Sequence, residues 1–153
     1  MLIHFVCSGN TNRSRMAEAY FNSKKISGMT ATSSGTHASH NFNGPITFFA
    51  KNILQKKGIL EYTAKTWQET NKELLKKADV VVFIKKKYFD FVNNELGYVP
   101  SRYYIWNIKD VESVEESESV KKINENKIRQ DETVFNNIKK AVDRLVVDLQ
   151  KTV

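Results

Sequence analysis

The most informative segment of the sequence is Leu2-Ile3-His4-Phe5-Val6-Cys7-Ser8-Gly9-Asn10-Thr11-Asn12-Arg13-Ser14. Residues 2–6 are a short apolar run, which predicts a buried strand. The polar, glycine-containing segment 7–12 predicts a turn. Helix-compatible residues follow at 14–21, with apolar side chains on one face. The chain therefore opens with a strand, a loop and a helix.

The same alternation continues along the chain. The apolar runs predict further strands at 29–34, 80–84 and 103–108, with a short extended piece at 64–67. Helical spacing of apolar residues predicts helices at 46–57, 70–77, 86–95 and 133–150, and the acidic segment 111–126 reads as a loop or loose helix. We expect Thr70 to cap the helix at 70–77, because Glu73 completes a capping box. Strands alternating with helices predict an α/β fold with a parallel sheet between two helical layers.

Length and composition limit the function classes. The 153 residues predict one domain, residues 1–153, with a full hydrophobic core. The sequence contains no apolar run long enough for a transmembrane helix, and its first residues lack the features of a signal peptide. Cys7 is the single cysteine, so no intramolecular disulfide can form. We therefore expect a cytoplasmic protein without a membrane partner.

A formal net charge of +7 raises the question of a nucleic-acid partner. The positive excess lies in residues 1–109, mostly as short lysine runs, while residues 110–153 carry more acidic than basic side chains. Arginine, the better reader of base edges, is much rarer than lysine here. We expect most lysines to be solvated and no nucleic acid to bind, while the basic surface favours anionic substrates.

The loop after the first strand carries the chemistry. A loop that leads into a helix directs several backbone N–H groups at one point, and this arrangement suits a tetrahedral oxyanion. Arg13 would add a fork that matches two phosphate oxygens. The same field would stabilise a thiolate at Cys7, to which Ser14 could donate a hydrogen bond. Gly9 permits close backbone approach, and Asn10 tolerates a left-handed conformation.

Four segments resemble one family, the low-molecular-weight protein tyrosine phosphatases and the related arsenate reductases. They are residues 6–18 with the loop motif, 32–36 on the second strand, 74–84 with the third strand, and 106–110. The resemblance spans residues 2–150. It implies a three-layer α/β/α fold of the phosphatase I type, with a four-stranded parallel sheet in the order 2-1-3-4.

The resemblance also implies a mechanism without metal or cofactor. Cys7 would attack phosphorus and form a cysteinyl-phosphate, and Asp110 would protonate the leaving oxygen. Asn10 and Ser33 match positions that brace the loop, and Ser14 matches the one that stabilises the thiolate. A phosphorylated protein or small aryl phosphate would be the substrate of a monomeric enzyme, with inorganic phosphate as product. The implied substrate-binding residues are Ser8, Gly9, Asn10, Thr11, Asn12, Arg13 and Ser14.

Two positions depart from the family pattern. Asn12 stands where the family usually has a second cysteine, and Asp110 is followed by Val111 rather than proline. If Asp110 does not act as the acid, Glu112 is the alternative. Two other functions stay open: an arsenate reductase that uses an external thiol, and a phosphate- or phosphopeptide-binding module with weak or no catalysis.

The wall of the substrate pocket is a separate question. Aromatic candidates are Phe42, Phe48, Phe49 and Tyr88. Because Phe48 and Phe49 lie on an amphipathic helix, we expect both to pack in the core. His37 and His40 fall in a loop, and three histidines with one cysteine at loose spacing predict no metal site.

Overall fold

The structure is a computed structural model that describes residues 1–110 and 120–152, with the backbone alone at 120–131. In chain order the strands and α-helices are β1 (Leu2–Cys7), α1 (Arg13–Ser23), β2 (Thr30–Gly35), α2 (Phe48–Lys56), α3 (Lys72–Lys77), β3 (Val80–Phe83), α4 (Lys86–Glu95), β4 (Tyr103–Ile105) and α5 (Val120–Lys151). Two single-turn 3-10 helices, η1 (Ala38–His40) and η2 (Leu60–Tyr62), lie in the connections.

The four strands form one parallel sheet in the order β2-β1-β3-β4, which confirms the predicted topology. β1 lies at its centre, with Cys7 paired with Gly35 of β2 and Val6 with Phe83 of β3. β3 is buried at every residue, because helices cover both faces of the sheet. The first strand therefore ends in the middle of the carboxyl edge, where open α/β sheets bind their ligands.

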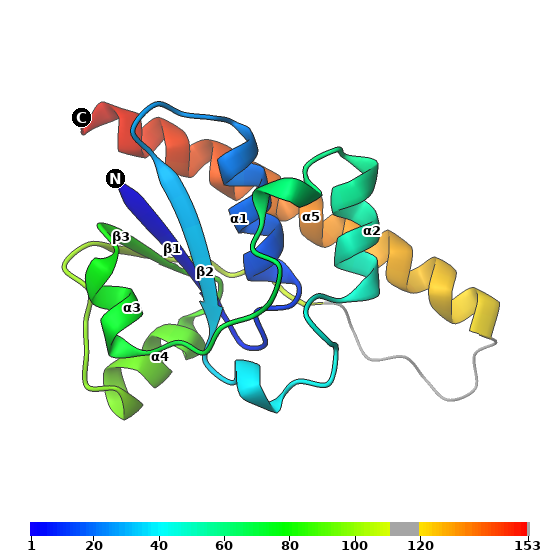
Figure 1. The fold of residues 1–153 in the computed structure, drawn as a ribbon, viewed down its shortest axis with the longest axis horizontal. Coiled ribbons are helices and arrows are strands. Elements are labelled where there is room, and N and C mark those ends of the chain that lie inside the picture. The colour runs from blue at the N-terminus through cyan, green and yellow to red at the C-terminus, as the bar shows by residue number, and fades with distance from the viewer. Residues whose placement is uncertain (111–119, 153) are drawn as a thin grey trace.

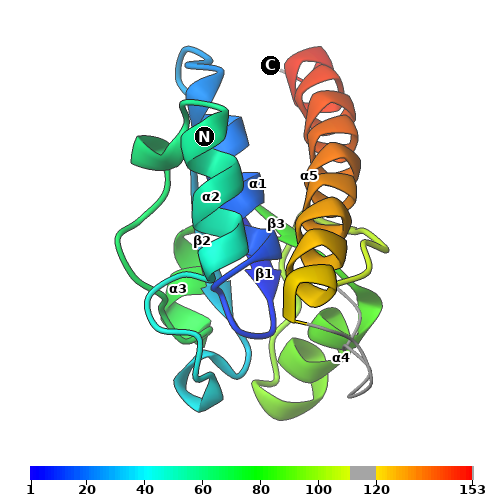
Figure 2. The ribbon, with the colours of Figure 1, turned by 90° about the vertical axis from the view of Figure 1, so that its right-hand side faces the viewer.

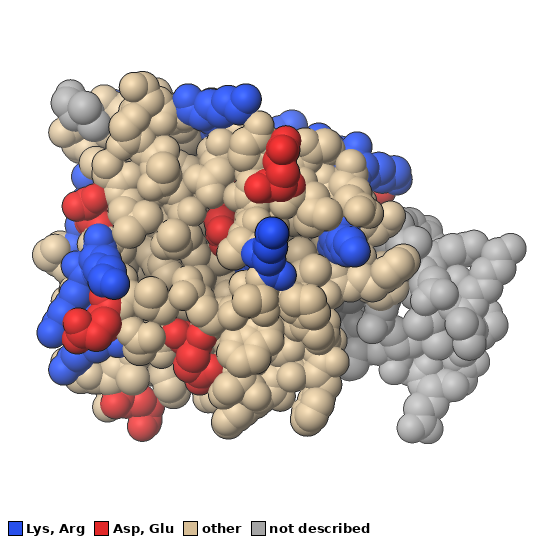
Figure 3. All heavy atoms as spheres, viewed as in Figure 1, with Lys and Arg blue, Asp and Glu red and all other residues tan. Residues whose placement is uncertain are grey.

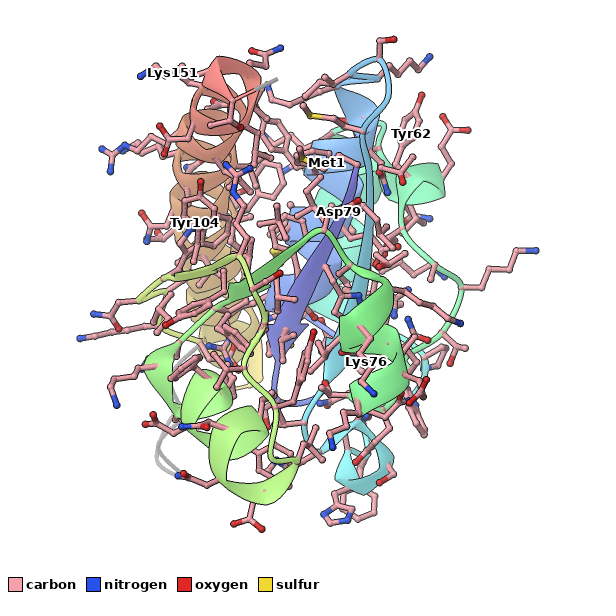
Figure 4. The ribbon with its side chains drawn as sticks, turned by 90° about the vertical axis from the view of Figure 1, so that its left-hand side faces the viewer. Met1, Tyr62, Lys76, Asp79, Tyr104 and Lys151 are labelled. Atoms are coloured by element: carbon pink, nitrogen blue, oxygen red, sulfur yellow. The ribbon has the colours of Figure 1, made fainter. Side chains whose placement is uncertain are left out.

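Two helical layers enclose the sheet. In Figures 1 and 2, α1, α2 and α5 lie together on one side of it, and α3 and α4 lie on the other. Phe5 of β1 meets Phe21 of α1 at a ring-centroid distance of 6.2 Å, which marks the core beneath α1. Figure 4, seen from the opposite side to Figure 2, shows Met1 and Asp79 at the amino ends of β1 and β3, far from the loop that follows β1. There the Leu2 N–H donates to the Asp79 carboxylate at 2.6 Å.

Several element boundaries differ from the sequence predictions. α2 begins at Phe48 because the Thr47 side chain accepts a hydrogen bond from the Ala50 N–H at 3.2 Å. The prediction that Thr70 caps α3 is wrong, because Asn71 accepts from the Leu74 N–H at 3.0 Å. The Thr70 hydroxyl is buried and pairs with Ser34 instead. β4 ends at Ile105, short of the predicted limit of 108.

Two predicted segments differ more strongly from the structure. Residues 64–67 form no strand, and the only bridge near them among the described residues joins Gly35 to Glu69. The last helix begins at Val120 rather than at 133. The first part of the predicted acidic loop, residues 111–119 with the alternative acid Glu112, lies outside the described residues.

The lysines of α3 and α4 are exposed and partly paired. Lys76 lies 3.9 Å from the Glu73 carboxylate and Lys86 lies 2.9 Å from that of Asp90. Figure 3 shows blue and red side chains mixed at the left edge of the molecule, over the region of α3. This agrees with the prediction that the lysine runs are solvated surface. Among the described residues, no helix combines the length and the apolar character that crossing a membrane requires.

Candidate active site

The loop that joins β1 to α1 turns back over the last residue of the strand. Asn10 has a left-handed backbone with φ of 54°, a conformation that asparagine tolerates better than most residues. This reversal lets the Asn10 N–H donate to Cys7 Sγ at 3.3 Å. The Cys7 side chain is buried, so the thiol sits at the base of the loop with a backbone donor aimed at it.

The end of β2 holds this loop in place. Thr36 and His37 donate their backbone N–H groups to the carbonyls of Cys7 and Ser8, both at 2.9 Å. Gly35 allows this approach: a Cβ there would lie 2.4 Å from the Ser8 carbonyl oxygen and 2.8 Å from the Asn10 nitrogen. A Cβ at Gly9 would meet two side-chain atoms, the Thr11 hydroxyl at 3.3 Å and Asn41 Cβ at 3.7 Å. The position that most needs glycine is therefore Gly35, which the sequence analysis did not single out.

Behind the thiol lies a chain of buried hydrogen bonds. Ser14 Oγ is 2.8 Å from Cys7 Sγ. The Asn10 side-chain amide donates one hydrogen to Ser14 Oγ at 2.8 Å and the other to Ser33 Oγ at 2.9 Å. The Ser33 hydroxyl donates in turn to the Glu18 carboxylate. Because the amide supplies both of its hydrogens, the Ser14 proton is left to point at Cys7 Sγ, where it stabilises negative charge on sulfur.

Glu18 terminates this chain from within α1. Its side chain is buried, and burial raises its pKa, although the hydrogen bonds from Ser33 and the Ala64 N–H act in the opposite direction. Asn10, Ser14 and Ser33 thus lie where the sequence placed loop support. Ser14 was also expected to bind substrate, but it is fully buried behind Cys7 and does not line the cavity described below.

Arg13, the first residue of α1, is buried and held from three directions. Its Nη1 donates to the Ile108 carbonyl at 3.0 Å, and its Nη2 donates to the Tyr88 hydroxyl at 2.6 Å. The Asp110 carboxylate lies 3.5 Å from Nη2. Burial opposes the charge of Arg13, but Tyr88 and Asp110 outweigh it and raise the pKa of the guanidinium. Arg13 therefore stays cationic at all working pH values.

Asp110 reaches the same place from beyond β4. Its Oδ1 accepts a hydrogen bond from Asn12 Nδ2 at 3.1 Å, and 53% of its side chain is exposed. The structure therefore brings together Cys7, Arg13 and Asp110, the three residues predicted to act in catalysis. Asp110 lies at the rim, open to solvent, while Cys7 and Arg13 lie at the base.

These residues line one cavity of about 760 Å³. Its floor is formed by residues 7–13, and its mouth by a mixed polar and aromatic set: His37, His40, Asn41, Phe42, Asn43, Thr47, Phe48, Phe49 and Asp110. The prediction of a core position is wrong for Phe48, which is 72% exposed, and for Phe49, which is half-buried and lines the cavity; Phe42 is fully exposed. Tyr88 is not part of the wall, because it is buried against Arg13.

Arg15 also supports the loop after β1, a role that the sequence analysis did not identify. It is fully buried, and its guanidinium donates to the carbonyls of Asn10, Pro45 and Ala64 and to the Thr63 hydroxyl. It thus ties the loop after β1 to two other connections. Its place two residues after Arg13 was the only sequence signal, and that signal does not separate a structural arginine from a second phosphate ligand.

Across the described parts of the chain, no three His, Cys, Asp or Glu side chains are grouped closely enough to hold a metal ion. His37 and His40 lie 5.9 Å apart between ring centroids at the cavity mouth. The groups that the cavity presents are the thiol, the cradle of N–H groups, the guanidinium and the carboxylate.

A cysteine at the base of an anion-binding loop, with an arginine beside it and a carboxylate at the rim, is the arrangement of the cysteine-dependent phosphatases. Residues 2–153 match the family model described as "Low molecular weight phosphotyrosine protein phosphatase". The chain belongs to this family, and it is a cysteine-dependent phosphatase and hence a hydrolase. No curated protein sequence matches it significantly.

Solved structures show the same fold at low sequence identity. YwlE arginine phosphatase from Geobacillus stearothermophilus has a TM-score of 0.75 and 24% identity, with 99% of this chain and 94% of that chain covered. A low molecular weight protein tyrosine phosphatase from T. tengcongensis has a TM-score of 0.76 and 22% identity, with 97% and 99% covered. Vibrio vulnificus Wzb in complex with benzylphosphonate has a TM-score of 0.73 and 16% identity, with 96% and 97% covered.

Proposed function

We propose that this protein is a protein tyrosine phosphatase that works through a cysteinyl-phosphate. The observation that carries the proposal is the place of Cys7 Sγ, 2.8 Å from Ser14 Oγ and 3.3 Å from the Asn10 N–H, at the base of the cavity that Arg13 and Asp110 share. A thiolate held by these two donors is the nucleophile in this proposal. The family match supports phosphate as the group that it attacks.

In the first step, the Cys7 thiolate forms a bond to phosphorus while the bond from phosphorus to the substrate oxygen breaks. The N–H groups of residues 8–13 and the Arg13 guanidinium hold the other phosphate oxygens, so that charge developing on them is stabilised without reorganisation. Asp110 gives its proton to the departing oxygen. Its position at the exposed rim supports this role, because the leaving group must point out of the cradle.

In the second step, water attacks the cysteinyl-phosphate from the side that the leaving group has vacated. Asp110, now a carboxylate, takes a proton from this water. The bond between sulfur and phosphorus breaks, inorganic phosphate leaves, and the thiolate returns to its hydrogen bond with Ser14. No metal or cofactor enters either step.

The aromatic mouth supports phosphotyrosine as the substrate. Phe42 and Phe48 are exposed beside the cradle, where a phenyl ring attached to the bound phosphate would contact them. Phosphoarginine is a second candidate, because the Asp110 carboxylate at the rim suits a guanidinium and one similar structure is titled an arginine phosphatase. Matched phosphotyrosine and phosphoarginine peptides, compared by kcat/KM, distinguish the two.

Hydrolysis of an aryl phosphate by the wild type, Cys7→Ser and Asp110→Ala tests the mechanism. We expect Cys7→Ser to abolish activity. We expect Asp110→Ala to lower the rate about 10²–10⁴-fold, which is the usual contribution of a general acid. Activity that survives Cys7→Ser would overturn the proposal. Arsenate-dependent thiol consumption faster than phosphatase turnover would instead favour the reductase. Tight phosphate binding without turnover by the wild-type chain would favour a binding module.

A further inference from the structure

Asn12 makes an unusual contact for its position. It occupies the N-cap of α1, where an asparagine side chain normally accepts a hydrogen bond from the first turn of the helix. Here the side chain makes no such bond. Its Nδ2 instead donates to Asp110 Oδ1 at 3.1 Å, across 98 residues of sequence. The local capping bond is therefore given up for a contact with the carboxylate at the rim.

This contact and the neighbouring one together orient the carboxylate. Asn12 meets Oδ1, and Nη2 of Arg13 lies 3.5 Å from Oδ2, so two consecutive residues each hold one oxygen of Asp110. The main chain of Asn12 is itself fixed, because its carbonyl accepts from the Met16 N–H at 3.0 Å in the first turn of α1. The residues that frame the phosphate cradle thus also set the direction of the carboxylate.

We propose that Asn12 is a positioning residue that determines which oxygen of Asp110 carries the catalytic proton. The inference rests on the proposed function, in which Asp110 is the general acid and base. An amide N–H only donates, so it favours an unprotonated Oδ1 and leaves the proton on Oδ2. In the first step the proton passes from Oδ2 to the leaving oxygen, and in the second a proton of the attacking water returns to Oδ2.

The type of residue fits this role. A lysine or arginine at position 12 would add a second positive charge beside Asp110, next to that of Arg13, and would favour the ionised carboxylate further. A neutral amide orients the group and still lets it take up a proton. In the proposed mechanism Arg13 also binds phosphate oxygens, whereas the Asn12 side-chain amide is directed at Asp110 Oδ1.

The test compares wild type, Asn12→Ala and Asp110→Ala on two substrates, p-nitrophenyl phosphate with a good leaving group and phenyl phosphate with a poor one. A misplaced acid penalises the poor leaving group most, because that oxygen needs the proton in the transition state. We expect Asn12→Ala to lower kcat/KM for phenyl phosphate about 10-fold and to change it about 2-fold for p-nitrophenyl phosphate. Asn94→Ala, an exposed asparagine on α4, is the matched control and should leave both values unchanged.

Two further measurements separate positioning from a structural role. The inhibition constant of inorganic phosphate should be the same in wild type and Asn12→Ala, because alanine keeps the backbone N–H in the cradle. In an Asp110→Ala background, Asn12→Ala should cause no additional loss, since its effect passes through Asp110. Asn12→Asp, which replaces the donor with an acceptor of the same shape, should be at least as impaired as Asn12→Ala.

The possible outcomes separate a failure of this inference from a failure of the proposed phosphatase mechanism. If Asp110→Ala depends steeply on the leaving group while Asn12→Ala behaves like wild type, the role of Asn12 is refuted and the phosphatase mechanism stands. If Asn12→Ala slows both substrates equally and weakens phosphate inhibition, Asn12 supports the cradle and not the acid, and the inference fails. If Asp110→Ala shows no such dependence, Asp110 is not the acid and both fail.

Discussion

Ser33 and Ser34 are neighbours on β2, yet their hydroxyls serve opposite faces of the sheet. Ser33 belongs to the chain of hydrogen bonds that runs from Glu18 through Asn10 to the thiol. Ser34 belongs to a second buried cluster, in which His4 lies between Thr32 and Ser34, with 2.7 Å to each hydroxyl. Both clusters are polar and involve side chains of β1 and β2, one on each face of the sheet. Burial and hydrogen bonding alone therefore do not distinguish them.

The difference lies in charge. The cluster behind Cys7 ends in the Glu18 carboxylate at one side and the nucleophilic sulfur at the other, and the Asn10 amide between them donates toward both ends. The cluster around His4 contains a neutral imidazole and hydroxyls, and burial lowers the pKa of His4 to about 4. A buried polar group thus becomes functional when its network ends on a reacting atom, as at Cys7, and stays structural when the network ends on other hydroxyls, as around His4.

We expect the largest effect at Gly35, which follows Ser33 and Ser34 on β2 and approaches the backbone of the loop at 8–10. In Gly35→Ala the added Cβ would lie 2.4 Å from the Ser8 carbonyl oxygen, which is backbone and cannot rotate away. We expect a loss of stability of about 3 kcal/mol, typical of severe overpacking, and a more than 10-fold loss of activity as the loop shifts. Urea denaturation and aryl phosphate hydrolysis measure the two effects.

Gly9→Ala provides the steric control for stability, because its Cβ would meet a hydroxyl that can rotate. We expect it to cost less than about 1 kcal/mol. Equal stability losses in the two variants would show that the approach of β2 to the loop is not the constraint.

The second effect is the pH dependence that His4 imposes. Its ordinary pKa is 6.5 and its folded pKa is about 4, so the unfolded chain binds the proton more tightly. Stability from this group is complete above pH 6.5 and is lost as the pH falls toward 4. We expect a loss of about 2 kcal/mol at pH 5, measured by urea denaturation at pH 7.5 and 5.

His4→Gln is the control for this pH dependence, because glutamine can bond to both hydroxyls and does not titrate. The difference in stability between the two pH values should be smaller in His4→Gln by about the same 2 kcal/mol. An unchanged difference would show that other groups dominate the acid response, and that the cluster around His4 is not the neutral one described above.

The parts of the site that are local in sequence could be predicted, and those that depend on distant segments could not. Cys7, Asn10, Arg13 and Ser14 follow one strand and open one helix, so the order of residue types is enough to place them. Tyr88 could not be assigned to Arg13, because nothing in the sequence near 88 shows that α4 brings its hydroxyl beneath the guanidinium.

The same limit explains the errors in the fold. The need for glycine at position 35 comes from the approach of a distant loop. The cap of α3 depends on which of two adjacent residues, Thr70 or Asn71, faces the helix. Thr70 has the right type for a cap, but its hydroxyl turns inward to Ser34 and leaves the cap to Asn71. Phe48 fits an amphipathic pattern, yet α2 lies at the edge of the cavity and exposes it. In each case the tertiary partner overrides the local preference.

The smallest and sharpest test replaces the two adjacent serines in turn. Ser33→Ala and Ser34→Ala remove the same atom from neighbouring positions of one strand, and each leaves a buried partner with one hydrogen bond fewer, so we expect each to cost about 1–2 kcal/mol of stability. Only Ser33→Ala should also lower activity, by about 3- to 10-fold, because the Asn10 amide loses one of the two acceptors that fix its orientation toward Ser14, which in turn contacts Cys7. Aryl phosphate hydrolysis at a temperature where both variants are folded measures this difference. If Ser34→Ala lowered activity as much as Ser33→Ala, the thiol would respond to general loosening of β2, and the polarity of its hydrogen-bond chain would no longer account for the difference between the two faces.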